Sequence, residues 1–324
     1  MSEKFVSVVC GGVGAARFLR ALASVWPAAD TVGVVNTGDD TVMHGLSISP
    51  DLDTITYTLS DAIDPERGWG LRDESWRAMQ ALTRYADIRP ANSAAAPTWF
   101  NLGDQDLATH FYRTARIAEG ASLTQTTDEI RRAWSIDQQL LPMSDQRVST
   151  MVTLADGPEV SFQEYFVKLR HDVAVSGVRF DGVDTAQLTP GARAAFTDAA
   201  AVIIAPSNPL VSIGPIRALP EVDDILGRRR DTVTAISPIV GGAALKGPAD
   251  RMLLELGFEA SVVGVARMYA PIASSLIIDP VDEHLANAVR HEGLEPIVVP
   301  SIMSDPVVAA ALARRSLAAV GLDS

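Results

Sequence analysis

The sequence has little cysteine and little positive charge, and it lacks any long apolar run. Its 324 residues include one cysteine, Cys10, so an internal disulfide and a metal cage built from cysteines are excluded. Lysine and arginine number 27 against 40 acidic residues, and the net charge of −13 offers no positive field to attract nucleic acid or an anionic membrane. No segment approaches the roughly twenty apolar residues of a membrane span. We therefore expect a soluble cytoplasmic protein without nucleic-acid or membrane partners.

Short apolar runs that end in polar turns recur in both halves of the chain, as in parallel strands covered on both faces. We predict strands at residues 5–10, 31–35, 201–205, 232–237, 261–266, 275–279 and 295–299. Residues 147–154 and 159–167 are also strand-like, and the turn residues between them predict a hairpin. The expected fold class is α/β, with a Rossmann-like, mostly parallel sheet.

Residues 61–141 differ from the rest of the chain in being rich in Trp, Arg, Glu and Ala. Helical spacing recurs there three times, at residues 73–85, 106–119 and 126–135. Asp104 and Thr127 are the predicted N-caps of the last two helices. We therefore divide the chain into a discontinuous α/β core, residues 1–60 and 142–324, and a mainly helical insert.

A glycine turn follows the first predicted strand and precedes a helical stretch. Gly11, Gly12 and Gly14 allow an anion to approach the amides of the helix N-terminus, so this turn is a candidate phosphate site. The dinucleotide fingerprint G-x-G-x-x-G fails at Arg17, and the next strand ends in Asn36 instead of an acid. A nicotinamide cofactor is therefore disfavoured. The alternative is that the glycines only make a tight turn between strand and helix.

An acidic, hydroxyl-rich stretch follows the second predicted strand. Its fifteen residues from 39 to 53 contain four aspartates, Asp39, Asp40, Asp51 and Asp53. Carboxylates so close in sequence repel one another unless a cation or a basic ligand group lies between them. The alternative is a solvated acidic loop with Asx turns. We expect these aspartates on a loop near the surface, so that replacing Asp53 leaves the fold intact.

A third polar loop, Pro206 to Pro209, follows the strand predicted at residues 201–205 and contains Ser207 and Asn208. Ligands bind open α/β sheets outside the carboxyl ends of the strands. If the three strands are neighbours, their loops converge on one crevice.

Seven motifs in the chain occur together, and in this order, in a known family: GGVGAARF at 11–18, NTGDD at 36–40, HGLSISPDLDT at 44–54, LGDQDLATH at 102–110, LPMSD at 141–145, PSNPLVSIGPI at 206–216 and SPIVGG at 237–242. The sequence thus resembles the 2-phospho-L-lactate transferase family of coenzyme F420 biosynthesis, nearly from end to end. The resemblance implies a Rossmann-like core with a helical insert, a homodimer and a divalent metal, usually Mg²⁺.

The resemblance also implies a reaction, the transfer of a phosphorylated three-carbon acid from its diphosphate linkage with guanosine to the terminal hydroxyl of the deazaflavin Fo, with release of GMP. Archaeal members are associated with a phospholactyl donor and many bacterial ones with an enolpyruvyl-phosphate donor, while a phosphoglyceryl donor is a third option. The composition, rich in Ala and Arg, suggests a bacterial source, so we favour enolpyruvyl phosphate and dehydro-F420-0. We assign no residue to recognition of the three-carbon acid.

Some site residues follow from the resemblance position by position. The second aspartate of PDLDT is Asp53, which the family uses at the deazaflavin site, and we place Asn101 and His44 at the same site. Some members have a basic residue at the position of Asn101. Archaeal members often have threonine at the position of Val13, which cannot supply a hydroxyl.

The chemistry of this reaction assigns roles to the polar loops. A diphosphate attacked by an alcohol needs its charge neutralised and its nucleophile placed in line. We predict that Asp39, Asp40, Asp51 and Asp53 hold Mg²⁺, and that Asp40 and Asp53 act in catalysis, with a general base as the second interpretation. For the nucleotide and its phosphates we predict Gly11, Gly12, Gly14, Ser207, Asn208 and Ser212.

Two interpretations from other classes stay open. The first is a non-catalytic regulator that binds nucleotide sugars, since a related family of bacterial morphogenesis proteins resembles this chain at the glycine loop; the PDLDT and SNP loops argue against it. The second is a dehydrogenase, against which Arg17 and Asn36 argue.

Overall fold

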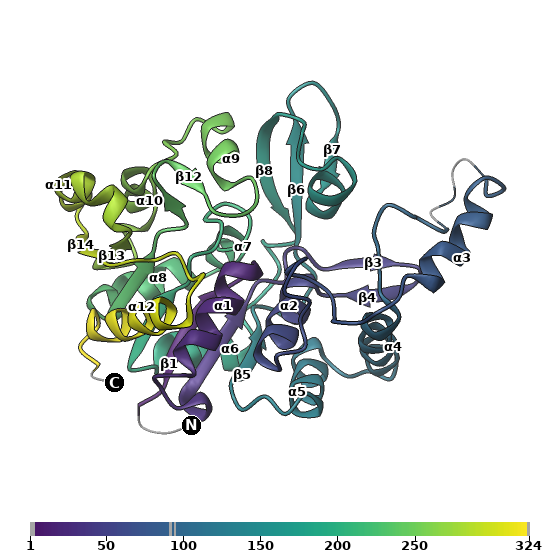
Figure 1. The fold of residues 1–324 in the computed structure, drawn as a ribbon, viewed down its shortest axis with the longest axis horizontal. Coiled ribbons are helices and arrows are strands. Elements are labelled where there is room, and N and C mark those ends of the chain that lie inside the picture. The colour runs from purple at the N-terminus through teal and green to yellow at the C-terminus, as the bar shows by residue number, and fades with distance from the viewer. Residues whose placement is uncertain (1–3, 91–92, 94, 323–324) are drawn as a thin grey trace.

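The computed structural model describes residues 4–90, 93 and 95–322. Its centre is a sheet of seven strands in which all neighbouring strands are parallel (Figure 1). From one edge to the other the strands are β14 (Glu295–Val298), β13 (Ser275–Ile278), β10 (Val233–Ile236), β9 (Ala201–Ile204), β1 (Val6–Cys10), β2 (Thr31–Val35) and β5 (Gln139–Pro142). The predicted α/β, Rossmann-like fold class is confirmed.

Helices cover both faces of this sheet because its inner strands are apolar throughout and need shelter from water on both sides. On one face α1 (Gly12–Leu22), α2 (Pro50–Leu59) and α12 (Pro306–Ala318) pack in one hydrophobic core. On the other face a second core contains residues of α6 (Pro190–Thr197), α7 (Gly214–Ala218), α8 (Val222–Arg228), α9 (Ala249–Glu255), α10 (Val262–Tyr269) and α11 (Ala286–His291).

Strand β1 lies between β2 and β9. After β1 the chain adds β2 and β5 on one side of this strand, and it later adds β9 on the other side of the same strand. This reversal is a topological switch point, where the loops after neighbouring strands separate and leave a crevice. The loops after β1, β2 and β9 are the three polar loops of the sequence.

The segment between the two parts of the sheet is mainly helical. It contains α3 (Arg77–Ala86), α4 (Asp104–Ala118) and α5 (Leu123–Ala133), and it follows a small hairpin of β3 (Thr41–Met43) and β4 (Leu46–Ile48). Figure 1 shows α3 projecting from the rest of the molecule. The division into a core and an insert with the boundaries given above stays a prediction.

Both predicted N-caps in this segment are wrong. Helix α5 begins after Ser122, which forms a capping box with Gln125, and Thr127 lies within the helix. Helix α4 is preceded by Gly103 and already includes Asp104, whose carboxylate accepts hydrogen bonds from Ser75. The carboxylate of Asp104 was expected to cap the helix, but it is used in a tertiary contact with Ser75 instead.

The strand predicted at residues 261–266 is helix α10. Ser261 caps this helix by accepting hydrogen bonds from the amides of Val263 and Gly264. Six of the eight residues of this helix are buried, so its sequence contains a short apolar run, and such a run does not distinguish a strand from a buried helix.

The predicted hairpin exists, but its second strand is shorter than expected. Strand β6 (Ser149–Leu154) pairs with β7 (Glu159–Ser161) and also with β8 (Val175–Asp181), which the sequence reading missed. A π-helix, Glu164–Lys168, replaces the rest of the predicted strand. The remaining elements are the pair β11 (Ile239–Val240) and β12 (Ala243–Ala244) and the 3-10 helices Ala28–Asp30, Arg230–Thr232 and Pro280–Leu285.

The acidic stretch is more ordered than a loop. Asp51 and Asp53 lie in the first turn of α2, where carboxylates interact favourably with the helix dipole. Both are buried, with 7% and 5% of their surface exposed, so the expected position near the surface is wrong. None of the helices among the described residues is long and apolar enough to cross a membrane.

Candidate active site

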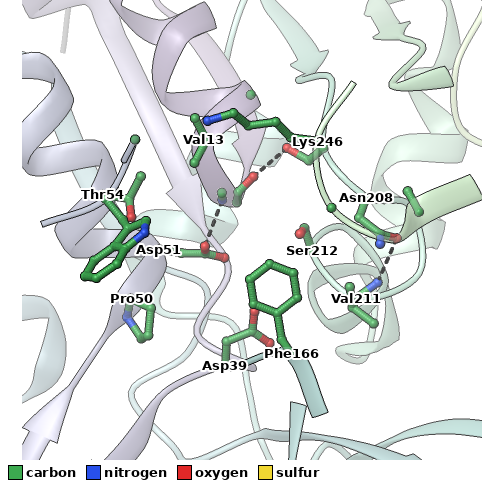
Figure 2. Close-up of a pocket in the computed structure, with 18 of the residues that line it drawn as sticks. Val13, Asp39, Pro50, Asp51, Thr54, Phe166, Asn208, Val211, Ser212 and Lys246 are labelled. Carbon is green, nitrogen blue, oxygen red and sulfur yellow. Dashed lines mark hydrogen bonds between the residues drawn. The ribbon is translucent and has the colours of Figure 1, made fainter. Parts of the chain in front are cut away.

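A cavity of about 860 Å³ lies at the carboxyl ends of the central strands. All three polar loops contribute to its wall, together with residues from α4 and from the segments after β7, β10 and β14. Of the predicted site residues, those lining it are Gly11, Gly12, Gly14, Asp39, Asp51, Asp53, Asn101, Ser207, Asn208 and Ser212. Figure 2 shows Asp39 and Asp51 on one side of this space and Asn208 and Ser212 on another. Asp40 and His44 are not among its lining residues.

The glycine turn is packed against its neighbours. A Cβ atom at Gly11 would lie 2.7 Å from Asp51 Oδ2, and one at Gly14 would collide with the carbonyl oxygen of Pro206. Gly12 has a φ of 75°, which favours glycine, and its amide donates a hydrogen bond of 2.8 Å to Asp51 Oδ1. Tight packing thus accounts for Gly11 and Gly14. The Gly12 amide, predicted to meet a phosphate, meets a carboxylate of the protein.

Asn36, at the end of β2, positions Asp51. Its Nδ2 atom donates a hydrogen bond of 2.9 Å to Asp51 Oδ2, while its Oδ1 accepts one from the Gly38 amide at 2.8 Å. Burial raises the pKa of Asp51 to about 6, although the hydrogen bonds from Asn36 and Gly12 lower it. The residue that breaks the dinucleotide fingerprint therefore orients a carboxylate of this site.

Asp39 and Asp40 form no ion pair among the described residues, although the charge of Arg113 lowers the pKa of Asp40. Burial, and then the charges of Asp51 and Asp40, raise the pKa of Asp39 well above its usual range. Burial raises the pKa of Asp40 to about 8, even though Ser49 Oγ donates a hydrogen bond of 2.7 Å to its Oδ2. In both residues the Oδ1 atom is buried without a hydrogen-bond partner among the described residues. Such bare carboxylate oxygens fit a hard divalent cation.

Asp53 has a partner of its own, Arg113 of helix α4. The guanidinium donates from Nη1 to Asp53 Oδ2 at 3.1 Å and from Nη2 to Asp53 Oδ1, so both carboxylate oxygens are engaged. Arg113 is only 1% exposed. A buried charge needs such a bidentate partner, and the pair joins the insert to the core.

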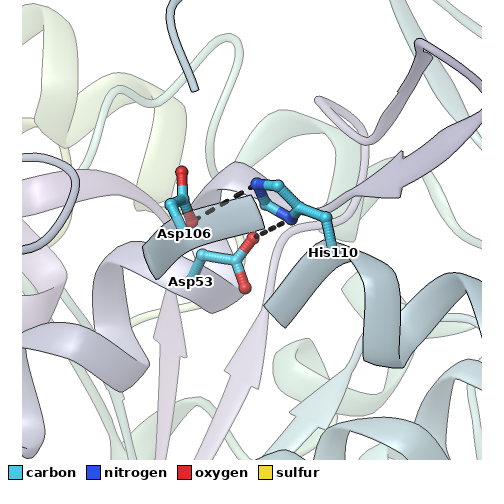
Figure 3. Close-up of side chains that lie close together, drawn as sticks. All are labelled: Asp53, Asp106 and His110. Atoms are coloured by element: carbon cyan, nitrogen blue, oxygen red, sulfur yellow. Dashed lines mark ion pairs between the residues drawn. The ribbon is translucent and has the colours of Figure 1, made fainter. Parts of the chain in front are cut away.

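Two more residues of α4 extend this network. His110 Nδ1 lies 3.7 Å from Asp53 Oδ2, and His110 Nε2 lies 3.3 Å from Asp106 Oδ1 (Figure 3). Tyr57 donates a hydrogen bond of 2.6 Å to the same Asp106 oxygen. Burial would raise the pKa of Asp106, but its contacts with His110 and Tyr57 keep the pKa below its usual value.

Ligand atoms of Asp53, Asp106 and His110 lie within 4.8 Å of one another, which is close enough to hold a metal ion. The Arg113 guanidinium already neutralises Asp53, however, and a second cation beside it would be repelled. Asp39, Asp40 and Asp51 do not form so close a group among the described residues, but Oδ1 of Asp39 and Oδ1 of Asp40 are buried without a hydrogen-bond partner there. Because Asp53 is already paired with Arg113, it is a weaker candidate for a metal ligand than those two residues.

The sequence reading quoted LGDQDLATH but gave Asp106 and His110 no role, and it missed Arg113. Their spacing was a usable signal, because residues 106, 110 and 113 fall on one face of a helix. Three cations on the cavity wall were missed too. Arg17, Arg170 and Lys246 form no ion pair with any acid in the part of the chain that is described, and burial and then the charge of Arg17 lower the pKa of Lys246.

The third polar loop uses its side chains partly for its own shape. Ser207 Oγ donates a hydrogen bond of 2.8 Å to the carbonyl oxygen of Gly11. Asn208 Oδ1 accepts a hydrogen bond of 2.9 Å from the amide of Leu210. Ser207 thus holds the loop against the glycine turn at the cavity, and Asn208 fixes the shape of the loop itself.

A family model described as 2-phospho-L-lactate transferase CofD matches residues 6–310. The chain belongs to this CofD family. A protein of Kitasatospora aureofaciens named phosphoenolpyruvate transferase is 39% identical over 318 residues, 97% of each chain. A protein of Mycolicibacterium smegmatis with the same name is 38% identical over 331 residues, 98% of this chain and 99% of the relative.

A crystal structure of a Bacillus halodurans protein of the UPF0052 family has a TM-score of 0.60 and 13% identity, and the match covers 98% of this chain and 99% of the other. At that identity the likeness shows a common fold and says nothing of function. CofD family membership makes this chain a member of a transferase family of coenzyme F420 biosynthesis and decides against the dehydrogenase interpretation.

Proposed function

We propose that this CofD family member transfers enolpyruvyl phosphate from a guanosine diphosphate-linked donor to the terminal hydroxyl of the deazaflavin Fo. The hydroxyl oxygen forms a bond to the phosphorus that carries the enolpyruvyl group, the bond from that phosphorus to the bridging oxygen breaks, and GMP leaves. The acceptor loses its hydroxyl proton, and the product is dehydro-F420-0. The names of the curated relatives favour this donor over the 2-phospho-L-lactyl and phosphoglyceryl alternatives.

The observation that carries the proposal is the distribution of charge around one cavity. Asp39 and Asp51 face it without a cation, and Arg17 and Lys246 face it without an anion. A diphosphate bound together with a divalent metal would satisfy both sets.

We infer that Asp39, Asp40 and Asp51 hold Mg²⁺. When bound, the metal would neutralise charge on the diphosphate. Arg17 and Lys246 would then stabilise the charge that remains on the phosphoryl oxygens. The Gly11, Gly12 and Gly14 turn with Ser207, Asn208 and Ser212 stays our proposed nucleotide site.

We place the acceptor beside Asp53 and Asn101, which both line the cavity. Arg113 keeps the Asp53 carboxylate in a fixed orientation, as required of a group that accepts a hydrogen bond or a proton from the attacking hydroxyl. His44, which does not line the cavity, has no assigned contact with this acceptor.

Two further properties are part of the proposal, namely a homodimer, which the resemblance implies, and a cytoplasmic location, which the composition suggests. Analytical ultracentrifugation of the purified protein tests the first. A dimer predicts twice the chain mass of 34.5 kDa, and a species of single mass at micromolar concentration would contradict it.

The function is tested by incubating the purified protein with Fo, Mg²⁺ and each guanosine-linked donor in turn, followed by mass spectrometry. We expect dehydro-F420-0 and GMP from the enolpyruvyl donor, and no product when Mg²⁺ is chelated. Product only from the lactyl or glyceryl donor would overturn the donor assignment and keep the reaction class. No product from any donor would overturn the proposed reaction.

A further inference from the structure

Three planar side chains form a ladder along one wall of the cavity. The rings of Phe162 and Phe166 have centroids 5.5 Å apart and are inclined by 18°, and those of Phe166 and His171 are 5.3 Å apart and inclined by 25°. All three residues line the cavity. Phe162 is anchored in a small hydrophobic core between β6 and the following segments, whereas Phe166 is 36% exposed.

The backbone that presents this ladder is unusual. A π-helix, Glu164–Lys168, carries Phe166, and the next turn places Arg170 and His171 at φ angles of 52° and 45°. π-Helical turns and left-handed residues other than glycine are rare, and they cluster at functional sites.

Specific hydrogen bonds hold this turn. The His171 amide donates to the carbonyl oxygen of Tyr165 at 2.9 Å, and Arg251 Nη1 donates to the carbonyl oxygen of His171 at 2.6 Å. The surrounding structure thus maintains a conformation that the sequence of the turn disfavours. Its result is that Phe166, Arg170 and His171 all face the same cavity.

The ladder lies on the nucleotide side of the cavity. Figure 2 shows the Phe166 ring in the space between Asp39 and the loop that contains Asn208 and Ser212. A Cβ atom at Gly247 would lie 3.9 Å from the Phe166 ring, which places the ring beside the loop of Lys246. The proposed acceptor residues Asp53 and Asn101 belong to other elements.

We propose that the Phe162–Phe166–His171 ladder is the platform for the guanine ring of the donor, with Arg170 binding the carbonyl edge of that ring. Planar bases stack readily on aromatic side chains. An arginine can donate two hydrogen bonds to the O6 and N7 atoms of guanine, and Arg170 has no acidic partner among the described residues to compete for it. This inference rests on the proposed function, because it takes the donor to be a guanine nucleotide.

The platform is tested with Phe166→Leu, and Phe258→Leu is the matched control because Phe258 is 45% exposed and does not line the cavity. Isothermal titration with GDP and fluorescence titration with Fo separate the two planar ligands. We expect Phe166→Leu to weaken GDP binding by at least about fivefold and to leave Fo binding within about twofold. The control should change neither.

Three outcomes would overturn the platform assignment. Unchanged GDP binding by Phe166→Leu removes the ladder from the site, and weaker Fo binding alone makes it an acceptor platform instead. Equal weakening of both ligands by a folded variant would show that the ladder does not serve the guanine ring in particular. If the wild-type protein binds no GDP at all, the donor class in the proposed function fails as well, which distinguishes that failure from a failure of the ladder alone.

Arg170→Met tests recognition of the guanine edge, with Arg314→Met on the exposed surface as its control. Adenine has an amino group in place of the O6 acceptor, so ADP cannot use the same pair of hydrogen bonds. We expect Arg170→Met to weaken GDP binding by about fivefold or more while ADP binding changes by less than about twofold. An equal loss for GDP and ADP would show that Arg170 contacts phosphate rather than the base.

Discussion

The four aspartates between residues 39 and 53 fall into two groups with opposite electrostatics. Asp39, Asp40 and Asp51 are buried without an ion pair among the described residues, and burial raises the pKa of each, although the charge of Arg113 lowers that of Asp40. Asp53, in the same helical turn as Asp51, is held by the guanidinium of Arg113. Asp51 and Asp53 are similarly buried but have different partners. The partner of Asp53 is Arg113 of α4, which lies 60 residues further along the chain.

The four aspartates thus serve two different tasks, although the sequence predicted a single metal-binding role for all of them. A group of uncompensated carboxylates costs stability until a cation binds, and it is therefore suited to hold one. A carboxylate fixed by a buried arginine is already satisfied and gains little from a metal. The first group is suited to the metal and diphosphate, and Asp53 is suited to orient the acceptor.

The largest effect is expected from breaking the buried pair. Asp53→Ala leaves the Arg113 guanidinium buried without a partner, which should lower the free energy of unfolding by about 3–5 kcal/mol, in contrast to the intact fold expected for a surface aspartate. Urea unfolding followed by circular dichroism measures this. The double variant Asp53→Ala/Arg113→Met should recover part of the loss. A single variant within about 1 kcal/mol of wild type would contradict the pairing.

The next effect concerns Asp39, Asp40 and Asp51, where a substitution is not expected to lower the free energy of unfolding. Burial raises the pKa of Asp39 and so favours its uncharged form, and Asn is a neutral side chain of the same shape, so Asp39→Asn should leave stability in the absence of metal unchanged or higher. Turnover should fall at least ~100-fold, equivalent to about 2.7 kcal/mol, with more Mg²⁺ needed for half activity. The measurement is turnover against Mg²⁺ concentration. Turnover above about a tenth of wild type at all concentrations would remove Asp39 from the metal site.

The pH dependence of stability distinguishes the same two groups. The pKa of Asp40 is raised to about 8 in the folded protein, so between pH 4 and pH 8 the folded state holds a proton that the unfolded state has released. This contribution to stability is therefore lost as pH rises, by about 2 kcal/mol between pH 6 and pH 8 without metal. Mg²⁺ should abolish the loss because it binds the ionised form. The same slope with and without Mg²⁺ in urea unfolding would contradict a cation site here.

The sheet was predictable because its signal is local. The apolar runs at β1, β2, β9, β10 and β13 end where polar loops begin, and burial on both faces makes such runs recognisable. The convergence of those loops followed from the rule that neighbouring parallel strands end at one edge. The same reasoning gave the wrong element for helix α10, because most of that helix is buried and its short apolar run looks like a buried strand.

The site was only half predictable, because its decisive contacts are not local. Nothing near Asp53 in the sequence shows that Arg113 will meet it, and nothing near Asp51 shows that the Gly12 amide will donate to it. The left-handed turn at Arg170 and His171 contains no glycine or asparagine from which it could have been predicted. Tertiary packing imposes these features, and a reading of local patterns misses them.

The smallest expected effect tests the one hydroxyl that supports the uncompensated group. Ser49 is the N-cap residue of α2, yet its Oγ accepts no hydrogen bond from a helix amide and instead donates one to Asp40 Oδ2. Ser49→Ala should lower the free energy of unfolding by about 0.5–1.5 kcal/mol. The loss should be larger above pH 8 than at pH 6, because the hydrogen bond favours the ionised carboxylate and lowers its pKa.

Ser60→Ala is the matched control for Ser49→Ala, since Ser60 lies at the other end of α2 and its Oγ donates to the carbonyl oxygen of Thr56 at 2.9 Å. A carbonyl does not titrate, so the loss of stability in this variant should be the same at pH 6 and above pH 8. Urea unfolding of both variants at the two pH values makes the comparison. If the loss of stability in Ser49→Ala were equally independent of pH, Asp40 would have to be ionised at both pH values, as expected of a carboxylate that is paired with a cation. Asp40 would then belong in one group with Asp53 and not with Asp39 and Asp51.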